Sequence, residues 1–94
     1  MISHSLMGAA VKKVEPKYPP MGTRVRAQGE VKVKILVDRK GNVVSACAIE
    51  GHPLLRSPAV NAAVQWKFKP NFGLTLRQKK KYIQSVIVFH FRLD

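Results

Sequence analysis

The residues that could carry acid–base or metal chemistry are few and scattered along this chain of 94 residues. Its histidines stand at positions 4, 52 and 90, and no cysteine or carboxylate completes a metal-ligand spacing around them. Ser-His-acid catalysis needs a carboxylate to orient the base, and glycoside hydrolysis needs a pair. The available carboxylates mostly fall at turns, strand ends or the terminus: Glu15, Glu30, Asp38, Glu50 and Asp94. We therefore predict no enzyme activity, no metal site and, without a glycine-rich phosphate loop, no cofactor.

The net charge of +12, from 17 Lys and Arg against 5 Asp and Glu, favours an anionic partner or simply keeps a small domain soluble. Its densest cluster runs from Arg77 to Lys81. Proteins that bind single-stranded nucleic acid add exposed aromatic platforms to such charge. Here Trp66, Phe89 and Phe91 fall on faces that we predict to be buried, so nucleic acid is a weaker hypothesis than a protein partner.

The single cysteine, Cys47, excludes an internal disulfide. Its neighbours are apolar, which favours a buried structural thiol. The longest apolar runs cover four residues, against about 20 for a membrane-spanning helix. The first ten residues lack the pattern of a signal peptide. A protein working outside the cytoplasm would need its targeting signal upstream of Met1.

Alternating hydrophobicity predicts three strands. Glu30–Asp38 and Val43–Glu50 flank a turn in which Gly41 can take positive φ, and together they form an antiparallel hairpin. Tyr82–Leu93 alternates again, with Ile83, Ile87, Phe89, Phe91 and Leu93 on its core face. This last strand is long for so small a domain.

Proline and glycine positions predict two short helices. Pro20 begins a helix that extends to about Ala27, with Gly29 as its left-handed stop. Ser57 and Pro58 suit the start of a second helix, which Pro70 ends. The inward-facing residues of the second helix are Ala59, Ala62, Ala63 and Trp66. We expect an α+β fold of two layers, in the order helix-strand-strand-helix-strand, with both helices packed on one face of a three-stranded antiparallel sheet.

Residues 1–13 read as a flexible or loosely docked lead-in, with a short strand near Ala9–Val14, and residues 14–94 as the domain. The edge of the last strand is the most interesting feature, because an extended peptide can add a strand to it. Lys79, Lys80 and Lys81 precede this strand, either as guards against aggregation or as attraction for an acidic peptide. Alternatively, the strand merely closes the sheet.

Five motifs resemble the TonB C-terminal domain family in the family's own order. Pro16-Lys17-Tyr18-Pro19 is similar to its P-x-Y-P motif, and Gly29–Val33 to its G-x-V-x-V strand. Val37–Val43 resembles the family hairpin, Gly51–Ala63 its loop and helix, and Trp66–Pro70 its W-x-F-x-P segment. The connector departs from the pattern, because Gly73-Leu74-Thr75-Leu76 replaces a Gly-x-Pro-Val segment.

The resemblance implies a periplasmic domain of an energy transducer that binds the TonB box of outer-membrane transporters by strand addition. Family members work with ExbB and ExbD through an inner-membrane anchor, so we expect an anchor and a proline-rich spacer upstream. The implied peptide-binding residues are Lys81, Tyr82, Ile83, Gln84, Ser85, Val86, Ile87 and Val88, with Pro16, Tyr18 and Pro19 close by. Alternative functions are an envelope module that binds peptidoglycan or protein without energy transduction, or nucleic-acid binding. The open edge could also pair two copies into a homodimer.

Overall fold

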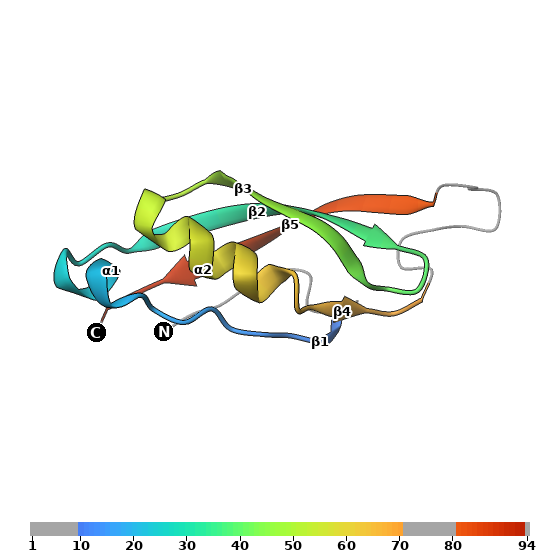
Figure 1. The fold of residues 1–94 in the computed structure, drawn as a ribbon, viewed down its shortest axis with the longest axis horizontal. Coiled ribbons are helices and arrows are strands. Elements are labelled where there is room, and N and C mark those ends of the chain that lie inside the picture. The colour runs from blue at the N-terminus through green and yellow to red at the C-terminus, as the bar shows by residue number, and fades with distance from the viewer. Residues whose placement is uncertain (1–9, 71–80, 94) are drawn as a thin grey trace.

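A computed structural model describes residues 10–70 and 81–93 of the chain. Its elements are β1 (Ala10–Lys12), α1 (Pro20–Arg24), β2 (Gly29–Asp38), β3 (Val43–Glu50), α2 (Pro53–Ala63), β4 (Lys67–Phe68) and β5 (Tyr82–Phe91). Figure 1 shows an elongated molecule in which β2, β3 and β5 follow the long axis and α2 lies against one face of them. The predicted two-layer α+β fold is confirmed.

The long strands form one antiparallel sheet in the order β3-β2-β5. In β2, the residues that face α2 are at most 1% exposed: Val31, Val33, Ile35 and Val37. Lys32, Lys34 and Leu36 point to the opposite, partly solvated face. This alternation is the expected pattern for a sheet with one buried face. The predicted hairpin and the predicted last strand are both confirmed.

The turn between β2 and β3 is fixed by one carboxylate and one glycine. Asp38 Oδ1 accepts hydrogen bonds of 2.9 Å from the backbone N–H groups of Lys40 and Asn42. Gly41 has a φ of 90°, and a Cβ at this position would lie 1.9 Å from the carbonyl oxygen of Phe68. Glycine is therefore required twice over, by the backbone conformation and by the close approach of Phe68.

The second helix begins earlier than predicted. Pro53, not Pro58, is its first-turn proline, and His52 is its N-cap. The Nδ1 atom of His52 accepts a hydrogen bond of 3.1 Å from the Leu54 N–H. Pro58 lies inside the helix, where it cannot donate to the carbonyl of Leu54. The earlier start adds a turn that buries Leu55 completely, which offsets the missing bond.

The prediction that Pro70 ends this helix is also wrong. α2 ends at Ala63, and Lys67–Phe68 form β4, which pairs antiparallel with β1. β1 lies within the short strand predicted near Ala9–Val14. Extended backbone after the helix places alternate residues on the same side. Trp66 and Phe68 are thereby both buried, at 1% and 2% exposure.

The first helix is shorter than predicted. α1 ends at Arg24, and Arg26, with a φ of 56°, takes the left-handed conformation that the sequence had suggested for Gly29. The Ala27 N–H then bonds to the carbonyl of Gly22 at 2.8 Å. This tight ending turns Ala27 into the core, where it is 4% exposed.

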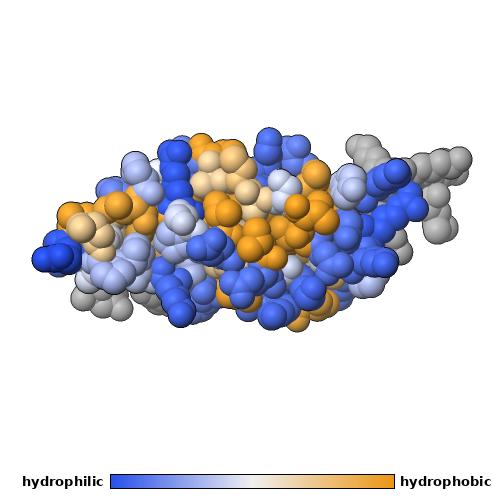
Figure 2. Space-filling model, in the orientation of Figure 1, coloured by the Kyte–Doolittle hydropathy of each residue, from blue (hydrophilic) through white to orange (hydrophobic). Residues whose placement is uncertain are grey.

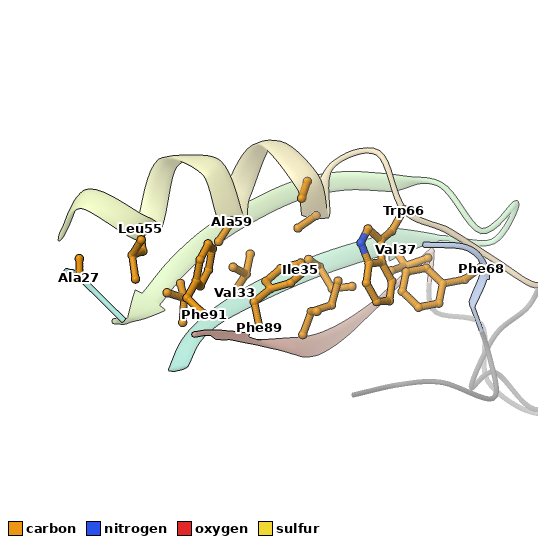
Figure 3. Close-up of a cluster of buried hydrophobic side chains, with 14 residues drawn as sticks. Ala27, Val33, Ile35, Val37, Leu55, Ala59, Trp66, Phe68, Phe89 and Phe91 are labelled. Carbon is orange, nitrogen blue, oxygen red and sulfur yellow. The ribbon is translucent and has the colours of Figure 1, made fainter. Parts of the chain in front are cut away.

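The core lies between α2 and the inner face of the sheet (Figure 3). The small residues that were predicted to face inward on α2 are buried, namely Ala59, Ala62 and Ala63. Trp66 is buried as well. Small side chains let the helix approach the strands closely. The Trp66 ring meets Phe89 of β5 edge-on, with the ring centroids 5.9 Å apart. Such edge-to-face pairs add to the energy of burial.

The prediction of a buried Cys47 is wrong, because its side chain is exposed. Cys47 pairs with Lys34 across the β2–β3 ladder and so shares the outer face of the sheet. Its neighbours Ala46 and Ala48 alternate to the other face and pack against the core. Apolar neighbours along a strand do not report burial, since successive residues point in opposite directions.

Several sequence predictions lie outside the described residues. They concern most of the lead-in, including His4, the connector segment Gly73-Leu74-Thr75-Leu76, and the basic run up to Lys80. Only Lys81 of that run is described, and it is exposed.

Candidate peptide-binding edge

Among residues 10–70 and 81–93, β5 is a terminal strand of its sheet, and its ladder with β2 is regular. Ten residue pairs, from Gly29–Phe91 to Asp38–Tyr82, follow one another without a register shift. β3 forms the opposite side of the sheet and has two register shifts in its pairing with β2. Irregularities of this kind protect edge strands from further pairing. Of the two terminal strands, β5 is therefore the better template.

The side chains of β5 become less exposed along the strand. Lys81, Tyr82 and Gln84 are exposed, with Tyr82 at 47%. Ile83, Ser85, Val86 and Val88 are half-buried, and Ile87 is fully buried. The accessible part of the predicted peptide-binding residues is therefore the segment from Lys81 to Val86. We call this segment the β5 edge.

The P-x-Y-P segment lies near the other end of the sheet. The Tyr18 ring packs edge-on against Phe91, with the ring centroids 5.5 Å apart. Phe91 pairs with Gly29, whereas Tyr82 pairs with Asp38. Nine residues of strand separate the two ends, about 30 Å. The structure thus places Tyr18 beside Phe91, three residues beyond Val88 and at the opposite end of β5 from Lys81.

The prolines and Tyr18 have clear structural roles. Pro16 is buried, and Pro19 is half-buried as the N-cap of α1. The Tyr18 hydroxyl donates a hydrogen bond to the carbonyl oxygen of Ala27. Burial raises the pKa of Tyr18, and the Arg26 guanidinium offsets part of that effect. The phenol therefore stays neutral and keeps its role as donor.

A basic hollow lies beside the first residues of β5, and sequence reasoning missed it. It has a volume of about 390 Å³ and is lined by Asp38, Arg39, Lys40, Lys81 and Tyr82. The sequence drew attention to the basic run that ends at Lys81, but not to Arg39 and Lys40 in the turn between β2 and β3. The pairing of Asp38 with Tyr82 could have revealed them, because it places the turn next to the start of the last strand.

The histidines that the structure describes have structural partners. His52 caps α2, and the Nδ1 atom of His90 lies 3.5 Å from Glu30 Oε1 across the β2–β5 pair. Within residues 10–70 and 81–93, no cluster of His, Cys, Asp or Glu could hold a metal ion.

Neither of the described helices is long and apolar enough to cross a bilayer. What this surface offers chemically is backbone pairing and positive charge. Figure 2 shows one face of the molecule, on which hydrophilic side chains surround smaller hydrophobic areas.

Comparison with known proteins agrees with this geometry. The family model described as "Gram-negative bacterial TonB protein C-terminal" matches residues 14–93. The fold is similar to the solution NMR structure of the Pseudomonas aeruginosa TonB C-terminal domain, with a TM-score of 0.61 and 23% sequence identity, over 99% of this chain and 87% of that one. No curated protein sequence matches the chain. Because the family model spans most of its length, this chain belongs to the family of Gram-negative bacterial TonB C-terminal domains.

Proposed function

We propose that this domain binds the TonB box of outer-membrane transporters by adding it as a strand to the β5 edge. The family is periplasmic and implies interaction with outer-membrane transporters in general. In the proposed role, the domain acts as a binding module and not as an enzyme. An upstream anchor would link it to ExbB and ExbD, so that the proton-motive force of the inner membrane drives nutrient uptake.

The observation that carries this proposal is the contrast between the two terminal strands. A peptide that adds a strand needs backbone N–H and C=O groups at regular spacing. β5 keeps one register over its whole pairing with β2, whereas the register of β3 shifts twice. A regular strand therefore supports addition at the β5 edge better than at β3.

The side chains of the β5 edge fit a partner of variable sequence. Tyr82 and Gln84 are exposed and alternate with the half-buried Ile83 and Ser85. In strand addition, the main chain supplies affinity and alternate side chains supply specificity. A mostly backbone interaction would let one domain serve several transporters.

The proposal can be tested with backbone-modified peptides. A TonB-box peptide is titrated into the ¹⁵N-labelled domain, and amide shifts should concentrate on Tyr82–Ile87. Two further versions of the peptide carry N-methyl groups at alternate residues, in opposite phase. Only every second N–H of an added strand faces the edge. One phase should therefore lose most of the binding, while the other should keep it.

These paired peptides control for composition, because they differ only in which N–H groups are blocked. Equal affinity of the two phases would rule out strand addition. Shifts that concentrate on β3 or α2 would place the binding surface elsewhere and overturn the proposal.

A further inference from the structure

Positive charge gathers at the end of the sheet where β5 begins. Arg39, Lys40 and Lys81 line the hollow beside Tyr82. Lys67 joins them, because its Nζ atom donates a hydrogen bond of 2.9 Å to Asn42 Oδ1 in the same turn. We call these four cations the hairpin-end cluster.

Among the residues that the structure describes, cations outnumber carboxylates at this end of the sheet. Asp38 is the carboxylate that lines the hollow, and its Oδ1 atom already accepts the N–H groups of Lys40 and Asn42. Away from the hollow, the Glu50 carboxylate forms an ion pair with Lys32, and Glu30 Oε1 lies 3.5 Å from His90 Nδ1. The hairpin-end cluster and Asp38 together carry a formal charge of +3, from four cations and one carboxylate.

The position of the cluster relates it to a strand on the β5 edge. Tyr82 is the first residue of β5, and its partner Asp38 begins the turn that carries Arg39 and Lys40. A peptide that runs along β5 past Tyr82 next meets Lys81, which lines the hollow together with Arg39 and Lys40.

We infer that the hairpin-end cluster selects partner segments in which the strand-forming stretch is flanked, at this end, by two or more carboxylates. This inference rests on the proposed strand addition and adds the chemistry of the partner to it. Complementary charges at the rim of an interface improve specificity and association rate more than they improve affinity. The preference should therefore be moderate and should weaken with salt.

The test uses one strand-forming peptide with different flanks. Four peptides carry Glu-Glu before the stretch, Glu-Glu after it, Lys-Lys before it or Lys-Lys after it. The dissociation constant of each is measured at low and at high ionic strength. Glu-Glu should improve affinity by about fivefold at one side only, as expected for two exposed ion pairs. The side that responds also reveals the direction of the added strand.

Charge-reversal variants show whether the cluster causes the preference. Lys40→Glu and Lys81→Glu should each reduce the advantage of the Glu-Glu flank, and the double variant should favour Lys-Lys. Arg24→Glu is the matched control, because it changes the net charge equally on exposed α1, at the other end of the sheet. It should keep the preference.

Three results would overturn the inference. The first is equal affinity for Glu and Lys flanks in a peptide that still shifts Tyr82–Ile87, which would leave the proposed function intact. The second is an equal loss of preference in Arg24→Glu. The third is that Lys40→Glu and Lys81→Glu weaken binding to phosphatidylglycerol vesicles and leave peptide affinity unchanged. A peptide that shifts no β5 amide would refute the proposed function itself, and the inference with it.

Discussion

The indole Nε1 of Trp66 donates a hydrogen bond of 2.9 Å to the carbonyl oxygen of Val14, a residue 52 positions earlier in the chain. This bond ties the segment before the P-x-Y-P motif to the chain that leaves α2. The indole ring at the same time packs against Phe89 of β5. One side chain therefore connects the N-terminal segment, the helix layer and the strand that we propose as the peptide template.

Replacing Trp66 by Phe should destabilise the fold by about 2 kcal/mol, because the partly buried carbonyl of Val14 loses its donor. The measurement is the free energy of unfolding in urea. Gln65→Ala is a suitable control, since it removes the exposed hydrogen bond from Gln65 Nε2 to the Asn61 carbonyl. The control should change stability by less than about 0.5 kcal/mol. Equal losses in the two variants would contradict the importance of the indole bond.

Gly41→Ala and Gly29→Ala should destabilise the fold by very different amounts, although both glycines have positive φ. At Gly41, the new methyl group would collide with the backbone of Phe68, whereas nothing lies within 4 Å at Gly29. We expect about 1–2 kcal/mol for the conformation alone at Gly29. Gly41→Ala should cost about 3 kcal/mol or more, because overpacking adds to the conformational term. Thermal unfolding of the two variants provides the comparison, and a Gly29 variant as unstable as the Gly41 variant would contradict this interpretation.

Hydrophobic alternation was sufficient to predict the sheet. Each strand has one buried face, so a register error would expose the whole buried set of Val31, Val33, Ile35 and Val37. The turn between β2 and β3 was equally predictable, because Asp38 and Gly41 have side-chain and backbone roles that few residues share. The sequence therefore determined the element that positions the β5 edge.

Helix boundaries and distant contacts were not predictable in the same way. His52-Pro53 and Ser57-Pro58 both suit a helix start, and only the burial of Leu55 distinguishes them. β4 has two residues, too few for a periodic signal, and it forms because β1 supplies a partner. The basic hollow was missed for a similar reason, since it joins cations on either side of the pairing between Asp38 and Tyr82.

The hydroxyl of Tyr18 should make stability depend on pH only at high pH. Burial raises the pKa of Tyr18 above the ordinary value of 10.0, so the folded state holds the proton more tightly than the unfolded state does. This contribution is fully present below pH 10 and is lost as the pH rises through the folded-state pKa. Tyr18→Phe should lose about 1 kcal/mol at neutral pH, the worth of the hydrogen bond to Ala27. In urea unfolding between pH 7 and 11, the difference in free energy of unfolding between wild type and variant should become smaller above pH 10. A difference that stays constant would contradict the assignment.

The exposed Cys47 offers a labelling test of the proposed edge. Because Cys47 lies on β3, N-ethylmaleimide should modify it in the folded protein and leave the affinity for a TonB-box peptide unchanged. In a Cys47→Ser background, Gln84→Cys places the thiol on the exposed part of the β5 edge. Modification there should reduce peptide affinity by at least tenfold, because the added group stands beside the strand that the peptide must pair with. Both modified proteins should keep the wild-type far-UV circular dichroism spectrum. If labelling at Cys47 blocks the peptide and labelling at Gln84→Cys does not, the partner strand adds to β3 and not to β5.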